Sequence, residues 1–390
     1  MPGQEKPYRV YRGGRQKGKV PLQTRPSRAS ARAKKEDGSG YRGPGPVKER
    51  KKWSRRRQIA VALGTLLLLL VIWAVTSYFA VRGGVNAANK RLPTGAAEAL
   101  DHQNSLIYTT PTNILILGTD HANQPGHETQ HSDSIMLIRT DPSRHRVVYL
   151  SIPRDLRVPI PGVGDTKINA AMQSGGAPLA IKTVASYTGL RVNHVIIVDF
   201  SQFKDVIDAL GGITVDVPER IISKFDCPLN AAKCVTWKGW RFAKGPQHMN
   251  GARALTYSRV RKNLLNPADT DITRTEHQQD VLRATLRKMT SFSTLWKLPF
   301  VGGKLVKPLA TDLSTLQFMQ IGWIYKRGHE LHCRLGGTPE TLPDGEAVIV
   351  AEGDDKEYVI LTMLGKTAPL APRPGEERYG AGCVTGSFPR

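Results

Sequence analysis

Two aspartates and one arginine stand at the ends of three short apolar runs in the middle of the chain. Asp120 follows the first run, Asp133 precedes the second and Arg154 follows the third. Each run is rich in Ile, Leu or Val and bounded by turn residues, which predicts a buried strand. Two carboxylates and a guanidinium suit a divalent cation and a phosphate, although a loop salt bridge uses the same residues. The runs are Asn113–Leu117, Ile135–Arg139 and Arg146–Ser151.

The connections between these runs predict how the charged residues meet. The turn between the second and third runs, residues 140–145, is too short for a parallel crossover, so an antiparallel hairpin is expected. Such a hairpin brings Asp133 and Arg154 to the same edge of the sheet. If the first run is also antiparallel to the second, Asp120 joins them.

A second candidate site follows residue 258, in the sequence Ser-Arg-Val-Arg. If this piece is extended, Arg259 and Arg261 project from the same face. Asp271 and Arg274 come shortly after them, so the segment is a candidate anion site, with a solvated run of charges as the alternative. A capping box at residues 273–276 predicts a long helix that ends near Ser291.

The remaining periodicity predicts an α/β fold, with a central mixed β-sheet flanked by helices on both faces (α-β-α). Helices are expected at Pro178–Gly189, Ser201–Leu210 and Asn250–Tyr257, with stop signals at the glycines. Strands are expected at His194–Asp199, Ile213–Val217, Ala347–Val350 and Tyr358–Thr362.

One uncharged stretch of 23 residues, Ile59–Val81, is long enough for a transmembrane helix of about 35 Å. Five basic residues shortly before it and one after it place the N-terminus in the cytoplasm and the rest of the chain outside. The expected domains are a basic, disordered cytoplasmic tail (1–57), an anchor helix (58–81), a linker (82–111), a catalytic domain (112–365) and a loosely ordered C-terminal tail (366–390).

The formal charge of +23 is concentrated in residues 1–57, which hold 19 Lys/Arg and four Asp/Glu. This tail has almost no apolar clusters, as is typical of disorder, and anionic membrane lipid is its simplest partner. It shows no helix-turn-helix pattern and little aromatic interleaving, so no nucleic-acid partner is expected.

All four cysteines follow the apolar stretch, in the part expected outside the membrane. That position suits disulfides, and Cys227–Cys234 with Cys333–Cys383 is the simplest of the three possible pairings; four free thiols are the alternative. The segment Glu219–Gln247 also holds three large aromatic residues. It either covers an apolar groove or packs its own aromatic side chains.

The motifs, taken in order over residues 112–290, resemble the LytR–CpsA–Psr family of membrane-anchored cell-wall glycopolymer ligases. No single motif is specific, but the ordered set is. The matching pieces are NILILGTD (113–120), SDSIML (132–137), SIPRD (151–155), KINAA (167–171), VDF (198–200), DALGGI (208–213), VDVP (215–218), NG (250–251), ALTYSRVR (254–261), DxDxxR (269–274) and QQ (278–279).

The resemblance implies a transferase that moves a glycopolymer from a polyprenyl-pyrophosphate-linked glycan donor to a peptidoglycan hydroxyl, as a phosphodiester. It implies that Asp120 and Asp133 bind Mg²⁺, the usual metal cofactor of phosphoryl transfer. The residues implied around the pyrophosphate are Arg154, Arg259, Arg261 and Arg274, with Asp271 orienting the arginines and Gln278 lining the site.

Two positions depart from the family pattern, because His131 and His277 stand where the family usually has Arg. Histidine carries a charge only when protonated, with a reference pKa of about 6.5, so the implied phosphate contacts are weakest here. Two other functions remain open. A lipid-pyrophosphate phosphatase would use the same groups with water as the acceptor. The older name of the family implies a transcriptional attenuator.

Overall fold

The computed structural model describes residues 8–10, 19–21, 53–102, 106–119, 132–266, 271–343, 345–351, 353–369 and 382–385. Residues 1–63 and 64–390 form two compact units. In the first unit, β1 (Tyr8–Val10) and β2 (Lys19–Pro21) form an antiparallel pair inside the tail that the sequence predicted to be irregular.

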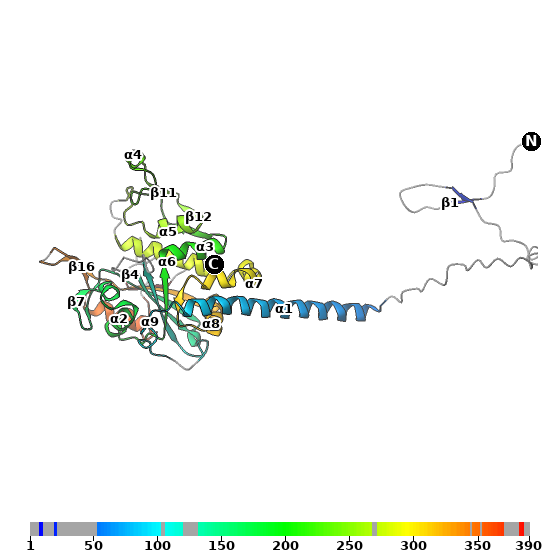
Figure 1. The fold of residues 1–390 in the computed structure, drawn as a ribbon, viewed down its shortest axis with the longest axis horizontal. Coiled ribbons are helices and arrows are strands. Elements are labelled where there is room, and N and C mark those ends of the chain that lie inside the picture. The colour runs from blue at the N-terminus through cyan, green and yellow to red at the C-terminus, as the bar shows by residue number, and fades with distance from the viewer. Residues whose placement is uncertain are drawn as a thin grey trace, which may run out of the picture. The chain divides into compact units, whose positions relative to one another are not determined.

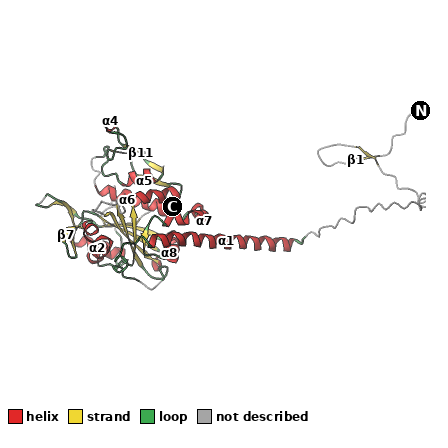
Figure 2. Cartoon of the chain, in the orientation of Figure 1, coloured by secondary structure: helices red, strands yellow, loops and turns green. Residues whose placement is uncertain are grey.

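A seven-stranded mixed sheet forms the centre of the second unit (Figures 1 and 2). The predicted hairpin is confirmed, because β4 pairs antiparallel with both β3 and β5. β8 is parallel to β3, and β14 is parallel to β5. In sheet order the strands are β13 (Ala310–Thr311), β8 (His194–Asp199), β3 (Thr112–Thr119), β4 (Ser132–Asp141), β5 (Arg146–Ile152), β14 (His329–Arg334) and β17 (Gly382–Thr385).

Helices cover both faces of this sheet, as predicted, because alternate strand residues are apolar on both sides. Leu115 and Leu137 pack on one face with residues of α2 and α9, while Met136 and Tyr149 pack on the other with residues of α6 and α8. The helices are α2 (Ala170–Thr188), α6 (Asp271–Met289), α8 (Thr315–Arg327) and α9 (Gly353–Met363).

A third apolar cluster joins the end of α1 (Arg55–Asn89) to the helices beside the sheet. Val85, Val206 and Val306 are three of its buried members. The predicted helix at residues 201–210 is confirmed as α3. The elements that meet there are α3 (Phe200–Ala209), α5 (Gly251–Ser258), α7 (Phe292–Val306), β9 (Ile213–Val217) and β12 (Gly245–Met249).

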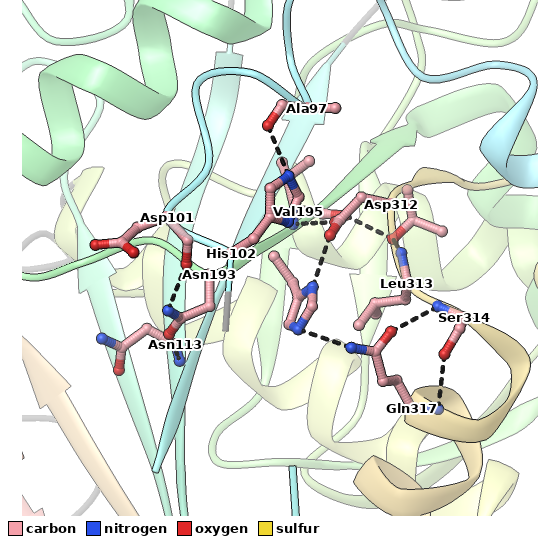
Figure 3. Close-up of polar contacts among 12 residues, drawn as sticks. Ala97, Asp101, His102, Asn113, Asn193, Val195, Asp312, Leu313, Ser314 and Gln317 are labelled. Atoms are coloured by element: carbon pink, nitrogen blue, oxygen red, sulfur yellow. Dashed lines mark hydrogen bonds and ion pairs between the residues drawn. The ribbon is translucent and has the colours of Figure 1, made fainter. Parts of the chain in front are cut away.

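The segment expected as a linker, residues 82–111, packs against the sheet: Ala96, Leu100 and Ile107 are buried. Figure 3 shows polar contacts that hold it: the Asn193 side chain donates to the Asp101 carbonyl at 2.8 Å. The Asp312 carboxylate lies 2.6 Å from His194 Nδ1 and so joins the start of β8 to the segment before α8.

Two segments differ from the sequence prediction. The strand predicted at Tyr358–Thr362 is wrong, because these residues lie in helix α9. The buried residues Val359, Thr362 and Met363 have helical spacing, and Asp354 and Asp355 favour a helix N-terminus. The helix predicted at Pro178–Gly189 is confirmed as the second part of α2, with Gly189 as its C-cap; a kink at residues 175–176 separates it from a first part, beginning at Ala170, that was not predicted.

The loop Glu219–Gln247 contains smaller elements, β10 (Ile221–Ser223), α4 (Ala231–Cys234) and β11 (Trp240–Phe242). Two of its aromatic residues pack on one another, since the Trp237 and Trp240 rings are 5.4 Å apart, and Trp240 Nε1 donates to the Phe225 carbonyl. Phe242 instead packs in the core against Tyr257 of α5. Both expected disulfides are present, Cys227–Cys234 here and Cys333–Cys383 between β14 and β17.

The remaining strands form two hairpins outside the central sheet. They are β6 (Arg157–Ile160) with β7 (Gly164–Lys167), and β15 (Thr338–Thr341) with β16 (Ala347–Val350), the last as predicted.

Candidate active site

The ends of β3, β4 and β5 carry the first predicted group of charged residues. In the β4–β5 pairing Ile135 lies opposite Ile152, so Asp133 and Arg154 each lie two residues beyond this pair, at the same end of the hairpin. The backbone therefore supports the predicted convergence. Asp120 and His131 lie outside the described residues, as does the side chain of Asp133. The metal role of the aspartates stays a prediction.

Arg154 is held at this edge by the residues around it. Its guanidinium lies 3.3 Å from the Asp155 carboxylate, which also pairs with Lys167 Nζ at 3.8 Å. Its backbone carbonyl accepts a hydrogen bond from the amide of Asn169, the residue before α2. The KINAA motif (167–171) thus fixes the strand exit at Arg154, whose side chain remains 20% exposed.

Arg259 stands directly after α5, and close packing fixes this helix against α3. The amide of Gly251 donates to Asp208 Oδ1 at 2.8 Å. A Cβ at Gly251 would lie 2.3 Å from the Lys204 carbonyl oxygen, so only glycine permits this contact. These contacts hold the start of α5 against α3, and Arg259 follows its last residue, Ser258.

Arg259 does not have the extended conformation under which it would share a face with Arg261, because its φ and ψ of −99° and −4° continue the helical turn. Its guanidinium points to the disulfide loop, where it pairs with Asp226 at 2.8 Å. Arg261 lies beyond the helix, exposed, after the fully buried Val260. Both arginines remain on the solvent side of α5 although the segment is not a strand.

Helix α6 begins at Asp271, two residues before the predicted cap. The side chains of Asp271 and Arg274 lie outside the described part of the structure. His277 is buried, with its ring 4.5 Å from that of Tyr257. This histidine, one of the two departures from the family pattern, therefore packs α6 against α5.

An apolar pocket of about 80 Å³ lies between the sheet and helices α3, α5 and α6. The sequence did not reveal a pocket, because its apolar lining residues read as ordinary core. Two of its polar lining residues are sequence neighbours of predicted site residues: Ser134 follows Asp133, and Ser258 precedes Arg259. A third, Gln278, is the residue predicted to line the site. The apolar members are Ile116, Met136, Val198, Phe200, Phe203, Val281 and Leu282.

The strand ends beside Asp120 and Asp133 also bury polar groups. Thr119 and Ser132 face each other across β3 and β4, and each is fully buried. Within the described residues, neither hydroxyl has a hydrogen-bond partner. Asp199, opposite Thr119 on β8, is 7% exposed and is a third carboxylate at this edge that the sequence did not assign. Unsatisfied oxygens beside carboxylates fit the hard-cation site predicted there.

The described residues thus place Arg154 just after β5, Arg259 just after α5, and an apolar pocket between the sheet and helices α3, α5 and α6. The chain belongs to the LytR_cpsA_psr family, whose model matches residues 77–347.

Among known relatives, the chain is 32% identical over 265 residues to the polyisoprenyl-teichoic acid–peptidoglycan teichoic acid transferase TagV of Bacillus subtilis (strain 168). That match covers 66% of this chain and 65% of the relative. It thus spans just under two thirds of the relative's length.

Solved structures agree with this assignment. The crystal structure of B. subtilis TagV superposes with a TM-score of 0.55 and 30% identity, over 66% of this chain and 96% of that one. A structure of TagT bound to LI-WTA superposes with a TM-score of 0.53 and 25% identity, over 67% of this chain and 94% of that one.

Proposed function

We propose that this protein is a membrane-anchored phosphotransferase that moves a glycopolymer from a polyprenyl-pyrophosphate carrier to a hydroxyl of peptidoglycan. The observation that carries the proposal is the apolar pocket whose polar residues, Ser134 and Ser258, adjoin Asp133 and Arg259. A polyprenyl pyrophosphate has the matching chemistry, an apolar chain joined to a strongly anionic head. The relative named as a teichoic acid transferase supports a teichoic-acid-like glycopolymer as the cargo.

In the proposed reaction, an acceptor hydroxyl attacks the phosphorus that bears the glycan. The new P–O bond forms a phosphodiester while the P–O bond to the polyprenyl phosphate breaks, and the hydroxyl proton passes to a base. Charge grows on the departing phosphate oxygens, so oriented cationic donors accelerate the step. In this proposal the donors are Arg154, which pairs with Asp155, and Arg259, at the end of α5. Arg261 and Arg274 would add to them, and Asp271 would orient the arginines.

Magnesium is part of the proposal, with Asp120 and Asp133 as its carboxylate ligands. Both residues adjoin the buried hydroxyls of Thr119 and Ser132, and oxygen donors of this kind suit a hard cation. When bound, the ion would neutralise charge on the pyrophosphate.

We further propose that α1 crosses the cell membrane with the N-terminal tail in the cytoplasm and the domain outside. α1 is the one helix in the described residues that is long and apolar enough to span a bilayer, and the basic residues cluster before it. External protease should remove the domain from intact protoplasts. Full protection of residues 82–390 would refute this orientation.

A labelled donor tests the reaction and separates it from simple hydrolysis. The full chain in lipid vesicles is given a polyprenyl-pyrophosphate-linked glycan that carries ³²P in the phosphate next to the sugar, with peptidoglycan as acceptor. Transfer leaves the label in peptidoglycan as a phosphodiester. A phosphatase leaves it in soluble glycan phosphate whether or not peptidoglycan is added, and that result would overturn the proposal.

A further inference from the structure

Helix α7 carries three large aromatic residues on an exposed face. Phe292, Trp296 and Phe300 are 78%, 60% and 80% exposed, and they recur every four residues, so they form one stripe. We call these three residues the aromatic stripe. A stripe of this kind on a folded domain marks a contact surface, because soluble surfaces seldom gather large apolar side chains.

The aromatic stripe packs against helix α1 through Trp296. The rings of Trp73 and Trp296 stack with centroids 6.2 Å apart, and Trp73 Nε1 donates to the Trp296 carbonyl at 3.1 Å. Further along, a Cβ at Gly84 would lie 2.7 Å from the Gly303 carbonyl oxygen. Small residues that let two backbones touch are typical of helix pairs in membranes. α7 therefore holds a fixed position along α1.

This contact with α1 sets the level of the aromatic stripe relative to the membrane. Trp73 lies within the uncharged stretch Ile59–Val81, eight residues before its end, which is about 12 Å along a helix. Trp296, stacked on Trp73, lies at the same level along α1. If the uncharged stretch crosses the bilayer, the first turns of α7 lie beside lipid and not beside water.

The composition of α7 agrees with that surrounding. Its sequence contains no Asp or Glu. Its two charges, Lys297 and Lys304, are exposed, and long lysine side chains can carry their ammonium groups from an apolar level to the head groups. Aromatic residues with flanking lysines are characteristic of helices at a membrane interface.

We propose that α7 is a second membrane contact, in which the aromatic stripe enters the leaflet next to the domain, beside α1. The inference depends on α1 crossing the bilayer and not on the transfer reaction. Its consequence concerns the apolar pocket. Leu298 of α7 and Phe203 of the pocket wall pack in one apolar cluster, so a membrane-seated α7 fixes the height of the pocket above the lipid.

A fluorescent label at the aromatic stripe tests this proposal in the full chain. All four cysteines are in disulfides, so Phe300→Cys introduces a single free thiol at an exposed position. The protein is labelled with the environment-sensitive fluorophore NBD and reconstituted in phosphatidylcholine–phosphatidylglycerol vesicles. The matched control is Val163→Cys, which is 49% exposed in the turn between β6 and β7.

We expect lipids with a nitroxide on the acyl chain to quench the label at position 300 several-fold more than the label at position 163, and aqueous iodide to show the opposite order. Equal iodide quenching at both positions, with no lipid quenching, would overturn the proposal. Shielding from iodide without lipid quenching, together with disulfide-linked Phe300→Cys dimers, would assign the stripe to a second copy of the chain and would overturn it too. The readout involves no transfer, so either failure leaves the proposed function standing.

Discussion

The side chains of Arg283 and Glu330 form an ion pair, with Nε and Oε2 3.0 Å apart, that joins α6 to β14. The two side chains are only 7% and 18% exposed. α6 also carries Gln278 and Arg274, so this pair fixes the helix that supplies one wall of the candidate site. His332 and Tyr149 extend the contact, since their rings stack 4.9 Å apart and His332 lies 3.3 Å from the same carboxylate.

Arg283→Ala should destabilise the protein strongly, because it leaves the carboxylate of Glu330 buried without its cation. The expected loss in the free energy of unfolding is about 3 kcal/mol. Urea unfolding of the detergent-solubilised chain, followed by intrinsic fluorescence, measures it. The control is Arg191→Ala, because Arg191 pairs with Asp101 at an exposed site, 73% and 49% accessible. That variant should lose less than about 1 kcal/mol. Similar losses in both variants would contradict the structural role of the buried pair.

The same cluster predicts that stability falls in acid. Burial raises the pKa of Glu330, but the hydrogen bond from His332 and the charge of Arg283 outweigh burial and bring that pKa down to about 2 from 4.5. Stability from a lowered carboxyl pKa is complete above pH 4.5 and is lost as the pH falls towards 2. Burial also lowers the pKa of His332, so in the unfolded chain it takes up its proton at a higher pH than in the folded chain.

Both groups therefore favour the unfolded state as the pH falls. The shift of Glu330 from 4.5 to about 2 corresponds to about 3 kcal/mol. Glu330→Gln should remove the part of the loss that occurs between pH 4.5 and 2. Unfolding free energies at a series of pH values give the slope for each protein. Identical slopes for the variant and the natural chain would rule out Glu330 as the titrating group.

The two disulfides should contribute unequally to stability. Cys333–Cys383 closes a loop of 50 residues and secures the edge strand β17, whereas Cys227–Cys234 closes a loop of seven. On loop entropy alone, replacing the first pair by serines should cost about 2 kcal/mol more than replacing the second. Urea unfolding of the two double variants compares them. A larger loss for the short loop would show that strain or packing outweighs loop closure.

Asp226 should weaken donor binding, because its carboxylate lies 2.8 Å from the Arg259 guanidinium that we assign to the pyrophosphate. The pair is 46% and 60% exposed, so the competing interaction is worth only about 0.2–1 kcal/mol. Asp226→Asn should therefore tighten polyprenyl pyrophosphate binding by about 1.5- to 5-fold.

Calorimetric titration measures this change. Asp205→Asn, at an exposed position on α3, alters the net charge equally and should have little effect. Weaker binding by Asp226→Asn would mean that Asp226 orients Arg259 for the ligand.

The sequence predicted the strands around the site because their apolar runs and turn residues are local signals. The antiparallel hairpin of β4 and β5 follows from one short turn, and the structure has it, with the pairing described as far as Ile135 opposite Ile152. Other parts depend on contacts between distant segments. The pocket combines Ile116, Phe203 and Leu282, which only the fold brings together.

Two strands of the central sheet, β14 and β17, also lack a clear strand pattern in the sequence. β14 reads HELHCR, with no β-branched residue, and its Glu330 and Arg334 side chains pair with Arg283 and Glu276 of α6. β17 lies in a Pro/Gly-rich tail and is secured by the disulfide at Cys383. At Arg259 the extended alternative does not hold, because this residue caps α5 in a helical conformation; α5 itself ends at Ser258, one residue beyond the predicted end at Tyr257.

Arg259→Lys tests the central claim most directly, because lysine keeps the charge but not the planar fork that binds two phosphate oxygens. Arg253→Lys on the same helix is the matched control, since Arg253 stacks over the Phe242 ring outside the pocket. Both variants are compared with the natural chain in the ³²P transfer assay, with thermal unfolding as a check that each is folded. We expect transfer by Arg259→Lys to fall about a hundredfold while Arg253→Lys retains its rate. A folded Arg259→Lys protein that transfers the glycan at the natural rate would contradict the assignment of this site.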